Sequence, residues 1–181
     1  FNIYGTLKAI GTESDSIIFD NFGDDRCSGF TLDNASDATE FSYVRISGAE
    51  KDDGGGMYLN GSNPTLSHVT IAGNTADYGG GMYVYDSPPT LTSSIVWNNS
   101  PGSIYVYTGN EDPLITYSDI EGGFEGAGNI DANPLFTDPE NGDYTLQEGS
   151  ACIDAGTADI DGDGTDDITD YFGSAPDMGE F

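Results

Sequence analysis

The feature that most limits the fold of this chain is a phrase that occurs twice, 25 residues apart. The sequence Gly-Gly-Gly-Met-Tyr stands at residues 54–58 and again at 79–83. A second pair, Asn-Pro-Thr-Leu-Ser at 63–67 and Pro-Pro-Thr-Leu-Thr at 88–92, keeps the same offset. A fixed period between about 20 and 50 residues is typical of stacked repeats, in which each unit buries its apolar face against its neighbours. The sequence therefore predicts a solenoid.

Apolar residues recur at the same period and form aligned columns. Within one repeat they stand two residues apart, as Val69 and Ile71 do, which is the periodicity of a β-strand. Gly, Asn and Pro stand between the apolar segments, where tight corners need them. Two of the columns, with steps of 24 or 25 residues, consist of Phe41, Leu66, Leu91 and Ile115, and of Ile46, Ile71, Val96 and Ile120.

These patterns predict an all-β fold, a right-handed parallel β-helix with three short strands in each turn. The length of 181 residues leaves room for about seven turns of about 25 residues. No stretch of ten or more residues has helical spacing, which argues against a helix-containing repeat. A β-sandwich, the alternative, also has strands every 8 to 12 residues or so. It does not explain identical phrases at a fixed offset.

The composition is strongly acidic. The chain has 32 Asp and Glu residues against 4 Lys and Arg residues, and a formal net charge of -28. Such a surface repels nucleic acid and anionic membranes and attracts divalent cations. No run of 18 apolar residues occurs, so we expect no membrane insertion. Without a signal peptide, and with many Gly, Asp, Ser, Thr and Tyr residues, the chain is expected to be a mature or excised secreted protein at the bacterial cell surface.

The two cysteines, Cys27 and Cys152, lie 125 residues apart. In a solenoid this distance is about five turns, beyond the Cα separation that a disulfide tolerates. One interpretation is that both are small apolar core residues. The other is a disulfide between neighbouring molecules.

Several phrases resemble those of known secreted β-helix proteins. The Gly-Gly-Gly-Met-Tyr repeats, with Ile-Ala-Gly-Asn at 71–74 and Val-Trp-Asn-Asn at 96–99, resemble repeats of polymorphic outer-membrane-protein-like β-helices. The C-terminal third resembles right-handed β-helix proteins of the choice-of-anchor kind, as in Asn-Pro-Leu-Phe at 133–136 and Asp-Met-Gly-Glu-Phe at 177–181. The resemblance implies the fold. It does not specify an activity, because this fold hosts adhesins, lyases, hydrolases and structural proteins.

The segment at 159–170, Asp-Ile-Asp-Gly-Asp-Gly-Thr-Asp-Asp-Ile-Thr-Asp, predicts a calcium-binding loop. Oxygen ligands stand at alternating positions, and Gly at position 6 permits the sharp turn. Without flanking helices, the loop is expected to be structural and to pin a C-terminal unit, 158–181, on the last turn of a β-helix at 1–157. The alternative is a solvated acidic loop. The predicted ligands are Asp159, Asp161, Asp163, the Thr165 carbonyl, Asp167 and Asp170.

The sequence gives little support for catalysis. Polysaccharide lyases need a base and a group that neutralises the uronate, and the candidates are Lys8, Arg26, Arg45, Lys51 and His68. Arg45 and His68 are expected to be outward neighbours on adjacent turns. Glycoside hydrolysis needs two carboxylates at a defined separation, and no motif selects a pair. We therefore expect a protein that is not an enzyme.

Tyrosines also follow the repeat. Tyr58, Tyr83, Tyr85, Tyr105 and Tyr107 are expected to form a ladder on one face. Such a ladder covers a sheet, or it holds sugars.

The leading functional hypothesis is a secreted structural protein that stacks head to tail into a calcium-stabilised extracellular filament. Solenoids need caps at their ends, and no polar cap is visible at the N-terminus, near Phe1. Head-to-tail contacts between unlike surfaces generate rings or filaments, so the expected partner is another copy of the chain. The alternative is a fragment of a surface adhesin or a carbohydrate-binding β-helix with a glycan partner. A polysaccharide lyase or hydrolase is the third hypothesis.

Overall fold

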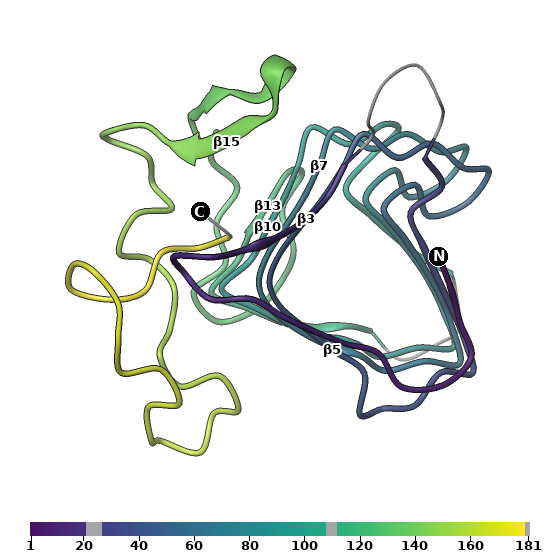
Figure 1. The fold of residues 1–181 in the computed structure, drawn as a ribbon, viewed down its shortest axis with the longest axis horizontal. Helices are drawn as coiled ribbons and strands as arrows, with labels where there is room; N and C mark the ends of the chain where they lie inside the picture. Colours follow the sequence, from purple (N-terminus) through teal and green to yellow (C-terminus); the bar gives the residue numbers. More distant parts are fainter. Residues whose placement is uncertain (21–26, 108–111, 180–181) are drawn as a thin grey trace.

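Most strands of this chain pair in parallel with strands one repeat away, and the chain winds into a parallel β-helix (Figure 1). The computed structural model describes residues 1–20, 27–107 and 112–179. Within these ranges there is no α-helix, and the one helical segment is the 3-10 turn Pro139–Asn141.

The first sheet contains five strands in spatial order. They are β1 (Asn2–Ile3), β4 (Phe30–Asp33), β6 (Met57–Asn60), β8 (Met82–Tyr85) and β11 (Ile104–Val106). Alternate residues of its three central strands, β4, β6 and β8, are buried, so this sheet has one face toward the core and one toward solvent.

The second sheet contains eight strands and supplies the other two sides of the coil. β5 and β7 run through both sides and bend at Tyr43 and His68, whose φ angles are 51° and 52°. In the next turns Ser93 and Tyr117 take the same left-handed conformation and separate the strands completely. The strands are β2 (Lys8–Ile10), β3 (Ile17–Phe19), β5 (Glu40–Ser47), β7 (Thr65–Ala72), β9 (Thr90–Thr92), β10 (Ile95–Trp97), β12 (Leu114–Thr116) and β13 (Asp119–Ile120).

The coil makes about four turns, and the expected seven turns are wrong. The five strands of the first sheet delimit four circuits of the chain. The periodic pattern ends at Ile120. Beyond β13 the described chain forms a cap, an antiparallel hairpin and loops instead of further turns.

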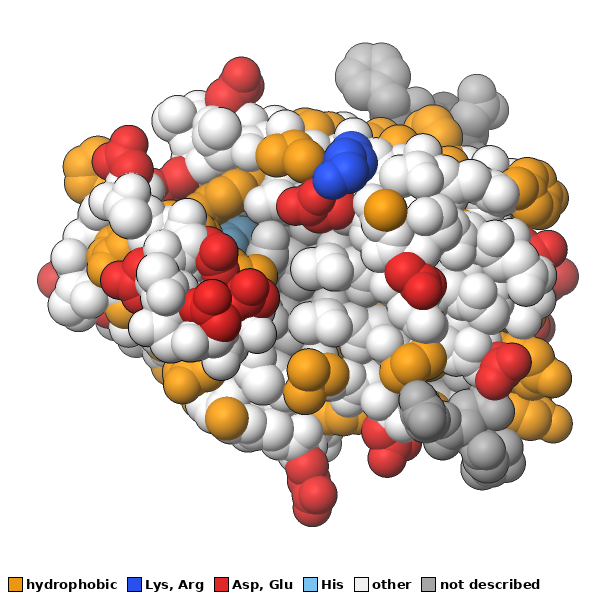
Figure 2. All heavy atoms as spheres, turned by 90° about the horizontal axis from the view of Figure 1, so that it is seen from below, with side chains coloured by type: hydrophobic (Ala, Val, Ile, Leu, Met, Phe, Trp, Pro, Cys, Tyr) orange, Lys and Arg blue, Asp and Glu red, His pale blue; other side chains and the backbone are white. Residues whose placement is uncertain are grey.

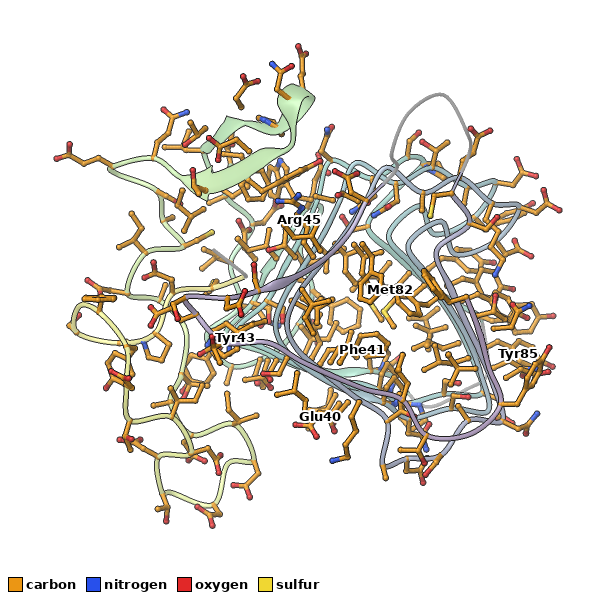
Figure 3. All side chains as sticks on the ribbon, viewed as in Figure 1. Glu40, Phe41, Tyr43, Arg45, Met82 and Tyr85 are labelled. Carbon is orange, nitrogen blue, oxygen red and sulfur yellow. The ribbon has the colours of Figure 1, made fainter. Side chains whose placement is uncertain are left out.

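The predicted apolar columns are confirmed by the strand register. Phe41 pairs with Leu66 and Leu66 with Leu91, and Ile71 lies between Ile46 and Val96. All six side chains are at most 1% exposed. Figure 3 shows Phe41 and Met82 inside the coil, where apolar side chains from all three sides meet.

The repeated glycines allow turns to stack without side chains between them. A Cβ atom on Gly56 would lie 2.7 Å from the Gly81 carbonyl oxygen, and one on Gly81 would lie 2.4 Å from the Ser103 carbonyl oxygen. Gly54 and Gly79, which start the two phrases, have φ angles of 64° and 60°, which favour glycine. The repeated phrase is therefore a steric requirement of one corner.

Buried asparagines hold the next corner. The Asn74 side chain accepts a hydrogen bond from the Ala49 amide (2.9 Å) and donates one to the Ile46 carbonyl (3.0 Å). One turn later, Asn99 accepts from the Asn74 amide (3.0 Å) and donates to the Ile71 carbonyl (2.9 Å). This ladder satisfies backbone groups that the bend removes from the sheets.

The segment after β13 covers the end of the coil. The amides of Tyr117 and Ile120 donate to the carbonyls of Ala127 (2.7 Å) and Ile130 (3.0 Å). Phe124 packs against the apolar core. The strand edge of the last turn is therefore paired by the chain itself between Tyr117 and Ile120.

The C-terminal segment then runs along the flank of the coil. The hairpin of β14 (Phe136–Asp138) and β15 (Asp143–Leu146) lies beside β7 and β10 in Figure 1. Cys152 and Met178 pack on Ile95, and the Gly179 amide donates to the Ser93 carbonyl (2.8 Å). The segment thus contacts the flank of the coil at Ser93 and Ile95 and does not only cover its last turn.

Candidate functional site

Three of the six predicted calcium ligands lie together. Carboxylate oxygens of Asp159, Asp161 and Asp167 are all within 4.8 Å of one another. The Asp159 carboxylate also accepts hydrogen bonds from the amides of Gly162 (2.8 Å) and Gly164 (2.9 Å), which fold the loop around it. Carboxylate oxygens are the ligands that Ca²⁺ prefers, so the donor set fits this ion.

The other predicted ligands have different surroundings. The Asp163 carboxylate accepts a hydrogen bond from the Thr165 amide (2.8 Å) and is not part of the three-carboxylate group. Asp170 lines a cleft between the loop and the coil. The calcium site therefore stays a prediction, with Asp159, Asp161 and Asp167 as its best-placed residues.

The tyrosines form the predicted ladder on the outer face of the first sheet. The rings of Tyr58 and Tyr83 have centroids 5.2 Å apart with an interplanar angle of 19°, and those of Tyr83 and Tyr105 are 5.1 Å apart at 27°. The Lys51 ammonium lies 5.1 Å from the Tyr58 ring centroid and extends the stack. Outer positions on neighbouring strands are aligned by the parallel register, which explains the stacking.

A second tyrosine column lies two residues further along the strands. Tyr85 and Tyr107 have ring centroids 5.1 Å apart at an angle of 57°, and their side chains are 39% and 44% exposed. Tyr78 is 55% exposed and tilted at 55° against Tyr105. Figure 3 shows Tyr85 projecting from the outer side of the sheet. We call Tyr58, Tyr78, Tyr83, Tyr85, Tyr105 and Tyr107 the tyrosine face.

The tyrosine side chains themselves are uncharged, although acidic side chains such as Asp33 and Asp53 lie near them. Burial, together with the charge of Asp53, raises the pKa of Tyr83, and burial raises the pKa of Tyr58. The phenols of Tyr58 and Tyr83 therefore keep their protons, and the tyrosines offer hydroxyl groups beside apolar ring carbons.

Arg45 and His68 are buried, and the expectation that they are surface neighbours is wrong. Arg45 does pair in register with Thr70, but its guanidinium lies 4.7 Å from the ring centroid of Tyr144 on β15. His68 is 1% exposed and stacks on Tyr43 at 4.7 Å and 13°. Both side chains point away from the core of the coil, and the C-terminal segment covers the flank on which they lie.

The remaining cationic side chains have structural partners. Lys8 forms an ion pair with Glu40 (2.9 Å), and Lys51 donates a hydrogen bond to the Thr31 hydroxyl. Arg26 lies outside the described residues. Within residues 1–20, 27–107 and 112–179, the cationic side chains are thus held in separate contacts and do not form a site for a uronate carboxylate.

A cleft of about 750 Å³ separates the C-terminal segment from the coil. It is lined by Tyr43 and His68 from the bend of the coil, by Glu13 from the first turn, and by Asp170 and Phe172 from the C-terminal segment. This cleft could not be predicted from the sequence, because it depends on how a non-repetitive tail folds back on the repeats.

Cys152 has a buried partner that the sequence did not reveal. Its thiol donates a hydrogen bond to the Asp119 carboxylate (3.2 Å), which also accepts one from the Ala132 amide (3.1 Å). Burial raises the pKa of Asp119 to about 6 and that of the Cys152 thiol well above its ordinary value. Cys152 is fully buried, which supports its interpretation as a core residue. A thiol in this position does not reach a neighbouring molecule.

Comparison with known proteins supports the fold. A family described as "right handed beta helix region" matches residues 8–134, more than half of the chain. Searches of curated proteins and of solved structures returned no match. In the described parts of the chain, no helix has the length and apolarity to cross a membrane.

Proposed function

The chain belongs to the right-handed β-helix family, and on this premise we propose that it is a non-catalytic glycan-binding protein that acts outside the cell. The family includes enzymes and proteins without enzymatic activity, so the fold alone does not decide between them. The observation that carries the proposal is the tyrosine face.

The tyrosine face has the chemistry of a glycan platform. Sugar rings present apolar C–H faces and hydroxyl groups, and tyrosines present apolar rings and hydroxyl groups in return. The tilted rings of Tyr78, Tyr85 and Tyr107 carry most of the exposed area, and the stacked rings of Tyr58, Tyr83 and Tyr105 support them. Exposed apolar patches of this kind mark binding surfaces. Because the protein carries a net charge of -28, we expect its ligands to be neutral glycans.

The environment of the charged residues supports a non-catalytic role. Arg45 and His68 are buried under the C-terminal segment. Figure 3 shows Arg45, and Tyr43 on which His68 stacks, away from Tyr85 and the tyrosine face. The described face thus combines tyrosines with scattered acids such as Asp33, whose carboxylate is hydrogen-bonded by Asn60 (2.9 Å). It has no cationic group beyond Lys51.

The proposal includes Ca²⁺ as a structural ion held by the loop at 159–170. The fit of the Asp159, Asp161 and Asp167 carboxylates supports this part. Head-to-tail assembly stays a prediction, and the pairing of Tyr117 and Ile120 with residues 127 and 130 speaks against an open edge at that end of the coil.

A glycan array with neutral and acidic glycans tests the proposal. We expect the wild-type protein to retain neutral glycans and the Tyr85→Ser/Tyr107→Ser variant to lose them. The Tyr117→Ser variant is the matched control, because Tyr117 lies off the face and Ser93 occupies the aligned position one turn earlier. Incubation of retained glycans with the protein should release no shorter products. Retention of none of the neutral glycans, or equal retention by the face variant, contradicts the proposal.

A further inference from the structure

The cleft between the coil and the C-terminal segment has features of a second binding site. Its volume of about 750 Å³ is in the range of sites for small organic ligands. Figure 2 shows a hollow beside the red acidic side chains of the C-terminal segment, with the pale blue histidine at its base. This cleft lies on the opposite side of the coil from the tyrosine face, as the labelled Tyr43 and Tyr85 show in Figure 3.

His68 is the buried polar group of this cleft. It is 1% exposed, and neither ring nitrogen has a hydrogen-bond partner among the described residues. Burying a polar group without a partner costs free energy, so such groups are rare in folded proteins. Stacking on Tyr43 fixes the plane of the ring, and Thr12 and Ser14 line the same cleft.

Burial also fixes the protonation state of His68. It lowers the pKa of the imidazole to about 4. The ring is therefore neutral near pH 7, and one of its nitrogens is a hydrogen-bond acceptor. An acceptor at the base of a cleft favours a ligand that donates hydrogen bonds.

The charges around the cleft are all negative. Carboxylates of Glu13, Asp167, Asp170 and Asp177 line it, and no Lys or Arg does so within the described chain. Asp167 and Asp177 accept hydrogen bonds from backbone amides, whereas Glu13 and Asp170 have no hydrogen-bond or ion-pair partner among the described residues. This arrangement repels anions and attracts cations.

The walls of the cleft fit an organic cation better than a bare metal ion. The group of carboxylates close enough to share an ion, Asp159, Asp161 and Asp167, does not include His68. Aromatic rings, which attract organic cations, lie on both walls: Tyr43 on the coil and Phe172, 86% exposed, on the C-terminal segment.

We infer that this cleft binds an organic cation with a primary ammonium group, and that His68 and Glu13 accept its hydrogen bonds. The ammonium group supplies three donors. The Glu13 carboxylate compensates the charge of the ammonium group, and a His68 nitrogen accepts a hydrogen bond from one of its N–H groups. The rings of Tyr43 and Phe172 contact the carbon atoms of the ligand. The inference does not depend on glycan binding at the tyrosine face, because the cleft and that face share no residue.

Three sugars that differ mainly in charge test the inference: glucosamine, glucose and glucuronate. Calorimetric titration in calcium-containing buffer should show binding of glucosamine to the wild-type protein and to the Tyr85→Ser/Tyr107→Ser variant. The variant, in which the tyrosine face is removed, should show no measurable binding of glucose or glucuronate. Because His68 is the one histidine of the chain, its ring resonances in NMR report directly on the cleft. They should shift during the glucosamine titration and saturate.

Two variants assign the contacts. Glu13→Gln should weaken glucosamine binding about fivefold, as expected for the loss of one partly exposed ion pair. His68→Phe should weaken it about tenfold, as expected for a lost hydrogen bond with stacking retained. Phenylalanine suits this position because Tyr43 and Tyr117 place aromatic rings at aligned positions with the same φ.

Two further variants serve as controls for the cleft. Glu125→Gln removes one exposed charge away from the cleft and should bind glucosamine like the wild type. The Tyr85→Ser/Tyr107→Ser variant should also bind it normally, which separates this site from the tyrosine face. If His68→Phe does not fold, Glu13→Gln and the His68 resonances still decide. Equal binding of glucosamine and glucose, no shift of the His68 resonances, or unchanged affinity in Glu13→Gln overturns the inference.

Discussion

Asn74 offers the sharpest test of how the coil is held together. Its side chain is fully buried and bonds two backbone groups, the Ala49 amide and the Ile46 carbonyl. The Asn74 side chain also donates a hydrogen bond to the Asn99 side-chain oxygen (3.0 Å). That oxygen accepts a second hydrogen bond from the Asn74 backbone amide, which a substitution of the side chain does not remove. In an Asn74→Ala variant, the two backbone groups lose their partners inside the protein.

The cost follows from these two groups. A buried donor or acceptor left unsatisfied costs about 1 to 3 kcal/mol. Asn74→Ala should therefore lower the free energy of unfolding by about 2 to 6 kcal/mol. This is a large fraction of the stability of a typical domain.

Urea unfolding followed by circular dichroism measures this change. Asn141→Ala is the control. Among the described residues, the exposed Asn141 side chain bonds only to the Asp138 carboxylate (2.8 Å), so this variant should change the free energy by less than about 0.5 kcal/mol. Unfolding slopes should stay equal, so that the midpoints report stability. If the two variants differ by less than about 1 kcal/mol, the asparagine ladder does not support the corner as described.

Three further predictions concern the corners, the cleft and the loop. Gly56→Ala should cost about 3 kcal/mol in urea unfolding because its Cβ meets a carbonyl oxygen, whereas Gly102→Ala, with open space around it, should cost less than about 0.5 kcal/mol. Because His68 has a pKa of about 4 when folded and about 6.5 when unfolded, the unfolded state takes up a proton first as pH falls from 6.5 to 4. Wild-type stability should then fall by up to about 3 kcal/mol relative to His68→Phe, and a constant difference between pH 7 and 4 contradicts this. Excess Ca²⁺ should raise the melting temperature. At a Ca²⁺ concentration of 100 times Kd, binding should stabilise the folded state by about 2.7 kcal/mol. Asp161→Asn should abolish most of this rise and Asp166→Asn, at a non-ligand position of the same loop, should preserve it; equal responses contradict the ligand assignment.

The repeats made the fold predictable from the sequence. Columns such as Phe41, Leu66 and Leu91 correspond to core positions because a parallel register places residues of one repeat directly over those of the next. The tyrosine ladder followed from the same rule. The number of turns was not predictable in this way. The length of the chain divided by the repeat period gives about seven turns, but the repeats stop at Ile120.

The parts that were not predictable involve the tail. Arg45 and His68 looked like surface residues because each points out of the coil, and only the fold of the C-terminal segment buries them. The Asp119–Cys152 contact has the same origin, since it joins the last turn to a segment that carries no periodic signal. The calcium motif could be identified from the local sequence, because its candidate ligands lie within twelve residues.

The measurement that tests the central claim most directly is NMR of the tyrosine rings during titration with the best-retained neutral glycan of the array. Ring resonances of Tyr85 and Tyr107 should shift and saturate, while those of Tyr117 and Tyr144, which lie off the tyrosine face, should stay in place. Shifts confined to Tyr117, Tyr144 or other rings off the face would show that the glycan binds elsewhere, and the account of the tyrosine face as the binding surface would be wrong.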